Sequence, residues 1–206
     1  MPQLEHERGP IVGLVLAAGM SRRLGRPKQL LDLAGKPLVM HVVARAIAST
    51  LDRVVVVVGH AGDQVAKALR NQDVEIVHNP DFAAGQSTSL IAGMHALPMG
   101  TDAIVVLLGD QPLVSTAAID ALIEGRRNFV DPVVMTGYGD VRSHPILFGR
   151  ELFAELLNSS GDQGAREVIR SHAADVLVVD SGDPTPPADV DTEEAYSRLL
   201  ETWLHN

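Results

Sequence analysis

The sequence predicts an α/β fold in which a doubly wound, mostly parallel sheet lies between two layers of helices. Several strand-like segments are apolar throughout, above all the run of valines at 54–58, and strands buried on both faces belong inside parallel sheets. These segments alternate with segments of helical periodicity, which is the pattern of right-handed βαβ units. Of the 206 residues, 46% are hydrophobic but only 3% are aromatic, so an aliphatic core is expected.

In the first part of the chain, apolar runs bounded by turn residues predict the strands. Helical spacing of Leu38, Val42 and Ala46 predicts a helix, and Pro37 suits its first position. We therefore expect strands at 11–17, 53–59, 74–77 and 103–108, and helices at 37–50, 63–70 and 86–96.

In the second part, a helix follows at 115–128, with Ser115 or Thr116 as its N-cap. The proline-rich stretch 181–188 is too short to divide domains and is interpreted as a surface loop. We expect further strands at 132–136, 146–148 and 176–179, and helices at 151–157, 163–172 and 192–204. Together these elements predict one domain over 11–206, preceded by a flexible N-terminus at 1–10.

Composition excludes several classes of function. A net charge of −9 argues against a general nucleic-acid binder, which needs a basic face, but it leaves room for a single nucleotide held by a local cationic loop. The absence of cysteine excludes disulfides, cysteine-ligated clusters and thiolate catalysis. No apolar stretch reaches membrane-spanning length and the N-terminus lacks the pattern of a secretory signal, so a cytoplasmic protein without a membrane partner is expected.

The most informative segment is residues 16–28, L-A-A-G-M-S-R-R-L-G-R-P-K. Small residues and two glycines after an apolar strand let the backbone approach a phosphate closely, and the arginines and Lys28 add positive charge. The spacing differs from a Walker loop, because two residues separate Gly25 from Lys28. It also differs from G-x-G-x-x-G, because no glycine lies between Gly19 and Gly25.

A second site candidate is Asp110, which follows the apolar strand at 103–108. Ligands of open α/β sheets gather at the carboxyl ends of strands, so Asp110 and the pair Asp189 and Asp191 could hold Mg²⁺ against a triphosphate. The alternative for Asp110 is an N-cap or turn aspartate. Whether Asp189 joins Asp191 is left open.

With these motifs in place, the chain resembles the molybdenum-cofactor cytidylyltransferases, a family with a MobA-like NTP transferase domain. The resemblance rests on L-A-A-G-x-S-x-R-x-G-x-x-K and on later motifs in the same order. One departure is Thr192-Glu193-Glu194 where the family usually has Thr-Pro-Glu-Asp, which keeps the acidic character. The later motifs are N-P at 79–80, G-Q-S-T-S-L at 85–90, L-G-D-Q-P at 108–112, H-P-I-L-F at 144–148, G-D-Q-G-A-R at 161–166 and D-V-D-T at 189–192.

The resemblance implies a Rossmann-like nucleotidyltransferase fold and a role for each matching residue. The implied catalytic residues are Arg23, Lys28 and Asp110, and the implied Mg²⁺ ligands are Asp110 and Asp191. The implied nucleotide-binding residues are Leu16, Ala17, Ala18, Gly19, Ser21, Arg23, Lys28, Gly85, Ser87, Ser89 and Asp110.

The second substrate is implied to contact His144 and Arg166. For His144 a turn-stabilising role is the alternative, and for Arg166 an ordinary ion pair on a helix face. The eight histidines of the chain show no paired metal-ligand spacing, so no structural metal is expected.

The reaction implied by the resemblance is attack of a phosphate on the α-phosphorus of CTP, with release of pyrophosphate. Ala17-Ala18 favours the cytidine-using branch, because guanine-using relatives more often read L-A-G-G. The implied acceptor is molybdenum-bound molybdopterin. The alternatives are a nucleotidyltransferase for a sugar or polyol phosphate, and a nucleotide-binding partner that delivers cofactor to a molybdenum hydroxylase apoenzyme.

Overall fold

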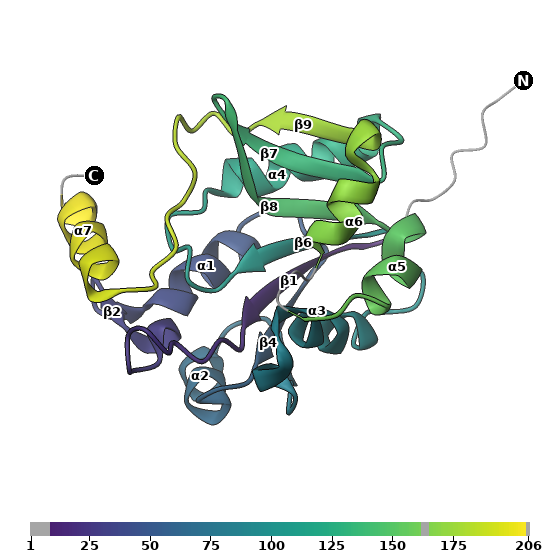
Figure 1. The fold of residues 1–206 in the computed structure, drawn as a ribbon. Coiled ribbons are helices and arrows are strands. Elements are labelled where there is room, and N and C mark those ends of the chain that lie inside the picture. The colour runs from purple at the N-terminus through teal and green to yellow at the C-terminus, as the bar shows by residue number, and fades with distance from the viewer. Residues whose placement is uncertain (1–8, 162–164, 205–206) are drawn as a thin grey trace, which may run out of the picture.

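The computed structural model describes residues 9–161 and 165–204 (Figure 1). Its main sheet has seven strands in the order β5-β4-β1-β6-β8-β7-β9, and the expected three-layer, mostly parallel architecture is confirmed. The strands are β1 (Ile11–Ala17), β4 (Arg53–Val58), β5 (Glu75–His78), β6 (Ala103–Leu108), β7 (Val133–Tyr138), β8 (Val141–Gly149) and β9 (Val176–Asp180).

Helices cover both faces of this sheet, as Figure 1 shows. On one face, Val42, Val65 and Ile119 pack with the strand residues Val56 and Val58 in an aliphatic core. On the other face, a second core joins residues of three further helices to Val55 and Ile104. The first face carries α1 (Leu38–Ile47), α2 (Gly62–Leu69) and α4 (Thr116–Asn128), and the second carries α3 (Gln86–His95), α5 (Phe153–Leu157) and α6 (Arg166–Ser171).

The strands expected at 132–136 and 146–148 belong to a β-hairpin that the sequence did not reveal. β8 is much longer than expected and pairs antiparallel with both β6 and β7, so among the described strands of this sheet it alone runs against the others. Its first half, residues 141–144, is mostly polar and at least partly exposed, which is why no apolar run marked it. The hairpin turns at Gly139, whose φ of 57° favours glycine.

Two of the expected segments extend beyond the described residues. The helix expected at 163–172 is described only as α6, since residues 162–164 lie outside the described residues. The flexible N-terminus expected at 1–10 also falls outside them over residues 1–8. Pro10, which is described, accepts a hydrogen bond from the backbone N–H of Asp102. No helix in the described part of the chain is long and apolar enough to cross a membrane.

A smaller cluster beside the sheet supports the glycine-rich loop. The C-terminal helix α7 (Glu193–Leu204) packs Leu199 and Trp203 against Leu24 and Leu38, and the small hairpin of β2 (Asp32–Leu33) and β3 (Lys36–Pro37) completes the cluster. The same cluster buries Val190. It therefore holds two segments far apart in sequence, the loop after β1 and residues 189–191, next to each other.

The loops after β1 and β6 meet at the carboxyl edge of the sheet. β1 lies between β4 and β6, so the strand order reverses there, and this is where ligands of such sheets bind. The backbone N–H of Gly109 donates to Leu16 O at 2.9 Å, and a Cβ on Gly109 would come within 3.0 Å of the Cβ of Ala17. The glycine allows the two strand ends to approach this closely.

Candidate active site

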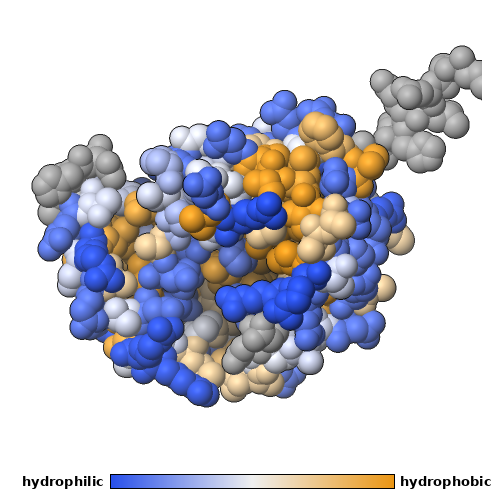
Figure 2. Space-filling view, turned by 45° about the horizontal axis from the view of Figure 1, so that its top comes forward, coloured by the Kyte–Doolittle hydropathy of each residue, from blue (hydrophilic) through white to orange (hydrophobic). Residues whose placement is uncertain are grey.

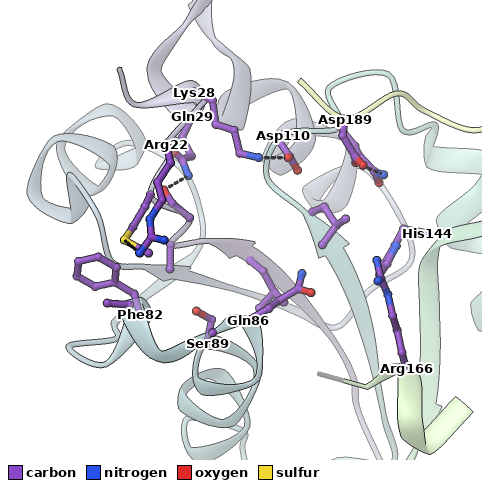
Figure 3. A pocket seen from close by; sticks show the side chains of 18 of the residues that line it. Arg22, Lys28, Gln29, Phe82, Gln86, Ser89, Asp110, His144, Arg166 and Asp189 are labelled. Atoms are coloured by element: carbon purple, nitrogen blue, oxygen red, sulfur yellow. Dashed lines mark hydrogen bonds and ion pairs between the residues drawn. The ribbon is translucent and has the colours of Figure 1, made fainter. Parts of the chain in front are cut away.

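A cavity of about 470 Å³ opens at this carboxyl edge (Figure 3). The glycine-rich loop forms one side, the start of α3 the floor, and β8 with α6 the opposite wall. It is lined by Leu16, Ala18, Gly19, Met20, Arg22, Lys28, Gln29, Phe82, Ala83, Gly85, Gln86, Ser89, Leu108, Asp110, Gln111, Ser143, His144, Arg166 and Asp189.

Hydrogen bonds within the glycine-rich loop position Lys28. Ser21 adopts a left-handed backbone conformation with φ of 53°, and its Oγ accepts from the backbone N–H of Lys28 at 3.0 Å. Gln29 is buried, and its Nε2 donates to Gly19 O at 3.1 Å. These two bonds cross the loop and direct the Lys28 side chain into the cavity, as Figure 3 shows.

The Lys28 ammonium joins two carboxylates that are distant in sequence. Its Nζ donates to Asp110 and, at 2.6 Å, to Oδ1 of Asp191. The Lys28 and Asp110 side chains are only 14% and 12% exposed, so solvent screens this pair weakly. Arg23 binds the other oxygen of Asp191 from the outside, with 69% of its side chain exposed.

These contacts determine the charge of the cluster. Burial lowers the pKa of Lys28, but the attraction of Asp110 and Asp191 outweighs it and raises the pKa above its usual value. Burial raises the pKa of Asp191, but Lys28 and Arg23 outweigh it and lower the pKa. Lys28 therefore remains a cation and Asp191 an anion at neutral pH.

The start of α3 forms the floor of the cavity. Gly85, with φ of 120°, precedes the helix in a conformation that favours glycine. The Nδ2 of buried Asn79 donates to the hydroxyls of Thr88 and Ser89, at 2.9 and 3.0 Å. The motifs around Asn79 and Gly85 thus act together, because the asparagine holds the first turn of α3 in place.

The opposite wall carries His144 and Arg166, with Asp189 above them in Figure 3. Asp189 accepts from Nε2 of Gln111 at 2.8 Å, which links the loop after β6 to the segment before α7. Burial lowers the pKa of His144 to about 4; Asp189 raises the pKa and Arg166 lowers it by smaller amounts. His144 is therefore neutral at physiological pH.

A neutral His144 has a measurable consequence for stability. Because its pKa in the folded state lies below the usual 6.5, the unfolded chain binds more protons between pH 6.5 and 4. The free energy of unfolding of the parent should therefore fall relative to that of His144→Asn as the pH drops through this window, by up to about 3 kcal/mol. Urea unfolding at several pH values measures this difference, and a difference that does not vary with pH would contradict it.

Most of the residues proposed from the sequence line this cavity, and five do not. Ala17 is buried in the sheet, and Ser87 is buried with its backbone N–H donating to Gly161 O. Ser21 supports Lys28, while Arg23 and Asp191 belong to the ion cluster. The residues of the proposed set that line the cavity are Leu16, Ala18, Gly19, Lys28, Gly85, Ser89, Asp110, His144 and Arg166.

Several lining residues were not singled out from the sequence. Arg22, the neighbour of Arg23, lines the cavity, and spacing alone could not distinguish the two. Gln29, Gln86 and Gln111 each follow directly on a residue that had been selected, which is the signal that could have found them. Phe82 had no such signal.

The arrangement fits a divalent metal only in combination with a ligand. No group of three or more His, Asp or Glu side chains among the described residues could hold a metal by itself. Asp110 and Asp191, however, contact the same ammonium group, so their oxygens are close enough to share one cation. Magnesium keeps several waters and uses one or two carboxylates together with phosphates, so this donor set fits it.

A doubly wound sheet whose switch point combines a cationic glycine-rich loop with strand-end carboxylates has the architecture of a nucleotidyltransferase. The model of the MobA-like NTP transferase domain matches residues 13–176, and the chain belongs to this family. It is a nucleotidyltransferase of the MobA-like type, and the family implies a nucleotide and a phosphorylated acceptor.

Two curated relatives match almost the full length. Nicotine blue oxidoreductase of Paenarthrobacter nicotinovorans is 31% identical, over 92% of this chain and 96% of the relative. Purine catabolism protein PucB of Bacillus subtilis is 30% identical, over 92% and 95%. The two names differ, so they do not identify the reaction of this chain.

Solved structures agree with the fold. A homologue of Rv0371c from Mycobacterium sp. strain JC1 is 33% identical with a TM-score of 0.85, over 95% of this chain and 97% of that one. Rv0371c of Mycobacterium tuberculosis in complex with manganese is 30% identical, with a TM-score of 0.82 over 94% and 99%. A nucleotidyl transferase of Methanothermobacter thermautotroptrophicus is 25% identical, with a TM-score of 0.81 over 95% and 98%.

Proposed function

We propose that this protein transfers CMP from CTP to a phosphorylated acceptor, molybdenum-bound molybdopterin, and releases pyrophosphate. The observation that carries the proposal is the contact of Lys28 with both Asp110 and Asp191 at the edge of a cavity large enough for a nucleotide. A lysine and two carboxylates at a glycine-rich loop can bind a triphosphate together with its metal.

The residues act by positioning and by neutralising charge. The acceptor phosphate is already an anion, so its attack on the α-phosphorus requires no strong general base. Lys28, with the arginines of the loop, stabilises the negative charge that develops on the phosphates. Leu16, Ala18 and Gly19, which line the cavity, hold the base and ribose so that the α-phosphorus faces the acceptor.

Asp110 and Asp191 are the residues that would hold Mg²⁺. When bound, the ion supplies positive charge at the triphosphate and favours departure of pyrophosphate. The manganese complex of Rv0371c, a structure 30% identical to this chain, supports the use of a divalent metal.

The choice of CTP rests on Ala18. Ala18 is one of the residues that line the cavity, and its Cβ lies beside Gly59, where an added Cβ would come within 2.8 Å of it. A methyl group at this position leaves less room for a purine than a glycine would.

We expect the parent to prefer CTP to GTP, and Ala18→Gly to reduce this preference about tenfold without reversing it. The reversal should fail because a purine also needs hydrogen-bond partners that a cavity alone does not supply. The measurement is kcat/KM for both nucleotides in both proteins. A parent that prefers GTP would contradict the assignment to cytidine.

The acceptor is tested by pyrophosphate release from CTP across a panel of acceptors. Molybdenum-bound molybdopterin should support turnover, whereas glucose 1-phosphate and glycerol 3-phosphate should not. Turnover with a sugar or polyol phosphate alone would favour the alternative acceptor class. Nucleotide binding without turnover on any acceptor would favour a protein that delivers cofactor to a molybdenum hydroxylase.

A further inference from the structure

A second cavity, of about 290 Å³, adjoins the first beyond Arg166. Arg166 lines both, so the two cavities share a wall. The second is an open depression lined by the β7–β8 hairpin, α6 and the start of β9, and its other charged residues are Arg142 and Arg170. None of the resemblance motifs includes Arg142 or Arg170.

The three arginines of this second cavity lack partners within the described residues. None of their guanidinium groups forms a hydrogen bond or an ion pair there, which is also true of Arg45, Arg53 and Arg127; what distinguishes this cavity is that its lining holds three arginines and no Asp or Glu. In a chain with 26 acidic and 17 basic residues, this lining concentrates positive charge at one place on the surface. Guanidinium groups recognise carboxylates and phosphates by paired hydrogen bonds, so the cluster suits an anion.

The rest of the cavity lining is apolar. Met135, Ile169 and Val176 are half-buried and belong to the edge of the core on this face of the sheet. Val178, the next residue on the same face of β9, is 38% exposed. Figure 2 shows an apolar area on this side of the molecule, bordered by strongly hydrophilic side chains.

We infer that the second cavity binds the body of the acceptor, and that this body is a flat ring system that carries an anionic group. The inference rests on the proposed function: Arg166 would contact the acceptor phosphate at the junction, while Arg142 and Arg170 bind a second anionic group of the acceptor. Met135, Ile169 and Val176 would pack against its face. A sugar phosphate, with a neutral and hydroxylated body, fits neither the cations nor the apolar lining.

The test uses pterin-6-carboxylate, a flat fluorescent ring with one carboxylate, and neutral pterin as the matched probe without charge. The parent should bind the carboxylate about tenfold more tightly than pterin in a fluorescence titration. Arg142→Gln and Arg170→Gln should each weaken binding of the carboxylate about tenfold and leave binding of pterin unchanged, because each removes one charge-assisted contact. Both arginines are exposed, so the variants should fold, and circular dichroism checks this.

Arg127→Gln is the control, the same change at an exposed arginine of α4 that lines neither cavity. Equal affinity of the parent and both variants for the carboxylate would overturn the inference. The inference would also be overturned if the parent formed a dimer and Arg170→Gln were a monomer, since the cavity would then be a contact between two copies. Probe binding needs no turnover, so it can succeed where nucleotidyl transfer fails, and the two proposals are tested separately.

Discussion

Replacement of Asp110 by asparagine should lower kcat/KM for pyrophosphate release about a thousandfold, the largest loss expected from a single change. Asparagine keeps the shape of the side chain but removes the charge that faces Lys28 and, in the proposed function, the metal. Asp110 also lies where the loops after β1 and β6 meet, and its carboxylate accepts from the Lys28 ammonium there.

The measurement is steady-state turnover of CTP with saturating acceptor over a range of Mg²⁺ concentrations. Asp131→Asn is the control, the same change at the opposite edge of the sheet, just before β7. It should leave turnover unchanged. Turnover of Asp110→Asn close to that of the parent, with an unchanged dependence on Mg²⁺, would remove Asp110 from the mechanism.

Replacement of Lys28 by methionine should lower kcat about a hundredfold, with a smaller effect on KM for CTP. The reason is that the lysine binds the phosphates most strongly as charge develops on them in the transition state. If only KM rose, Lys28 would be a docking residue. If neither constant changed, Lys28 would have no part in the reaction. Lys36 on β3 is exposed, so Lys36→Met is the control and should change neither constant.

The same variant has a second readout that does not depend on activity. In the free protein the Lys28 ammonium lies between Asp110 and Asp191, the position that suits a metal cation. Its removal leaves two neighbouring carboxylates without their counter-ion. We therefore expect Lys28→Met to bind Mn²⁺ in the absence of nucleotide about tenfold more tightly than the parent, measured by electron paramagnetic resonance. Weaker binding by the variant would show that the two carboxylates do not share a cation.

The order of the elements could be read from the sequence because it depends on local patterns. The segments that form β1, β4 and β6 are buried on both faces of the sheet, and such burial requires consecutive apolar residues. The glycine-rich loop was equally readable, because close backbone approach requires small residues at fixed positions. The first half of β8 could not be predicted from the sequence, because its side chains are at least partly exposed and an exposed strand needs no apolar run.

The site itself needed the tertiary structure. Lys28 is 82 residues from Asp110 and 163 from Asp191, and no local pattern reports a contact over such distances. The sequence by itself determined which residue types lie at the carboxyl ends of the strands. Only the tertiary structure shows which of them face each other. The reason is that a loop has no helical or strand periodicity, so the direction of each side chain depends on the residues that it contacts. Arg23 therefore binds Asp191 outside the cavity, whereas its neighbour Arg22 lines the cavity. In the same way, the packing of α6 places Arg166 and Arg170 around the same cavity as Arg142.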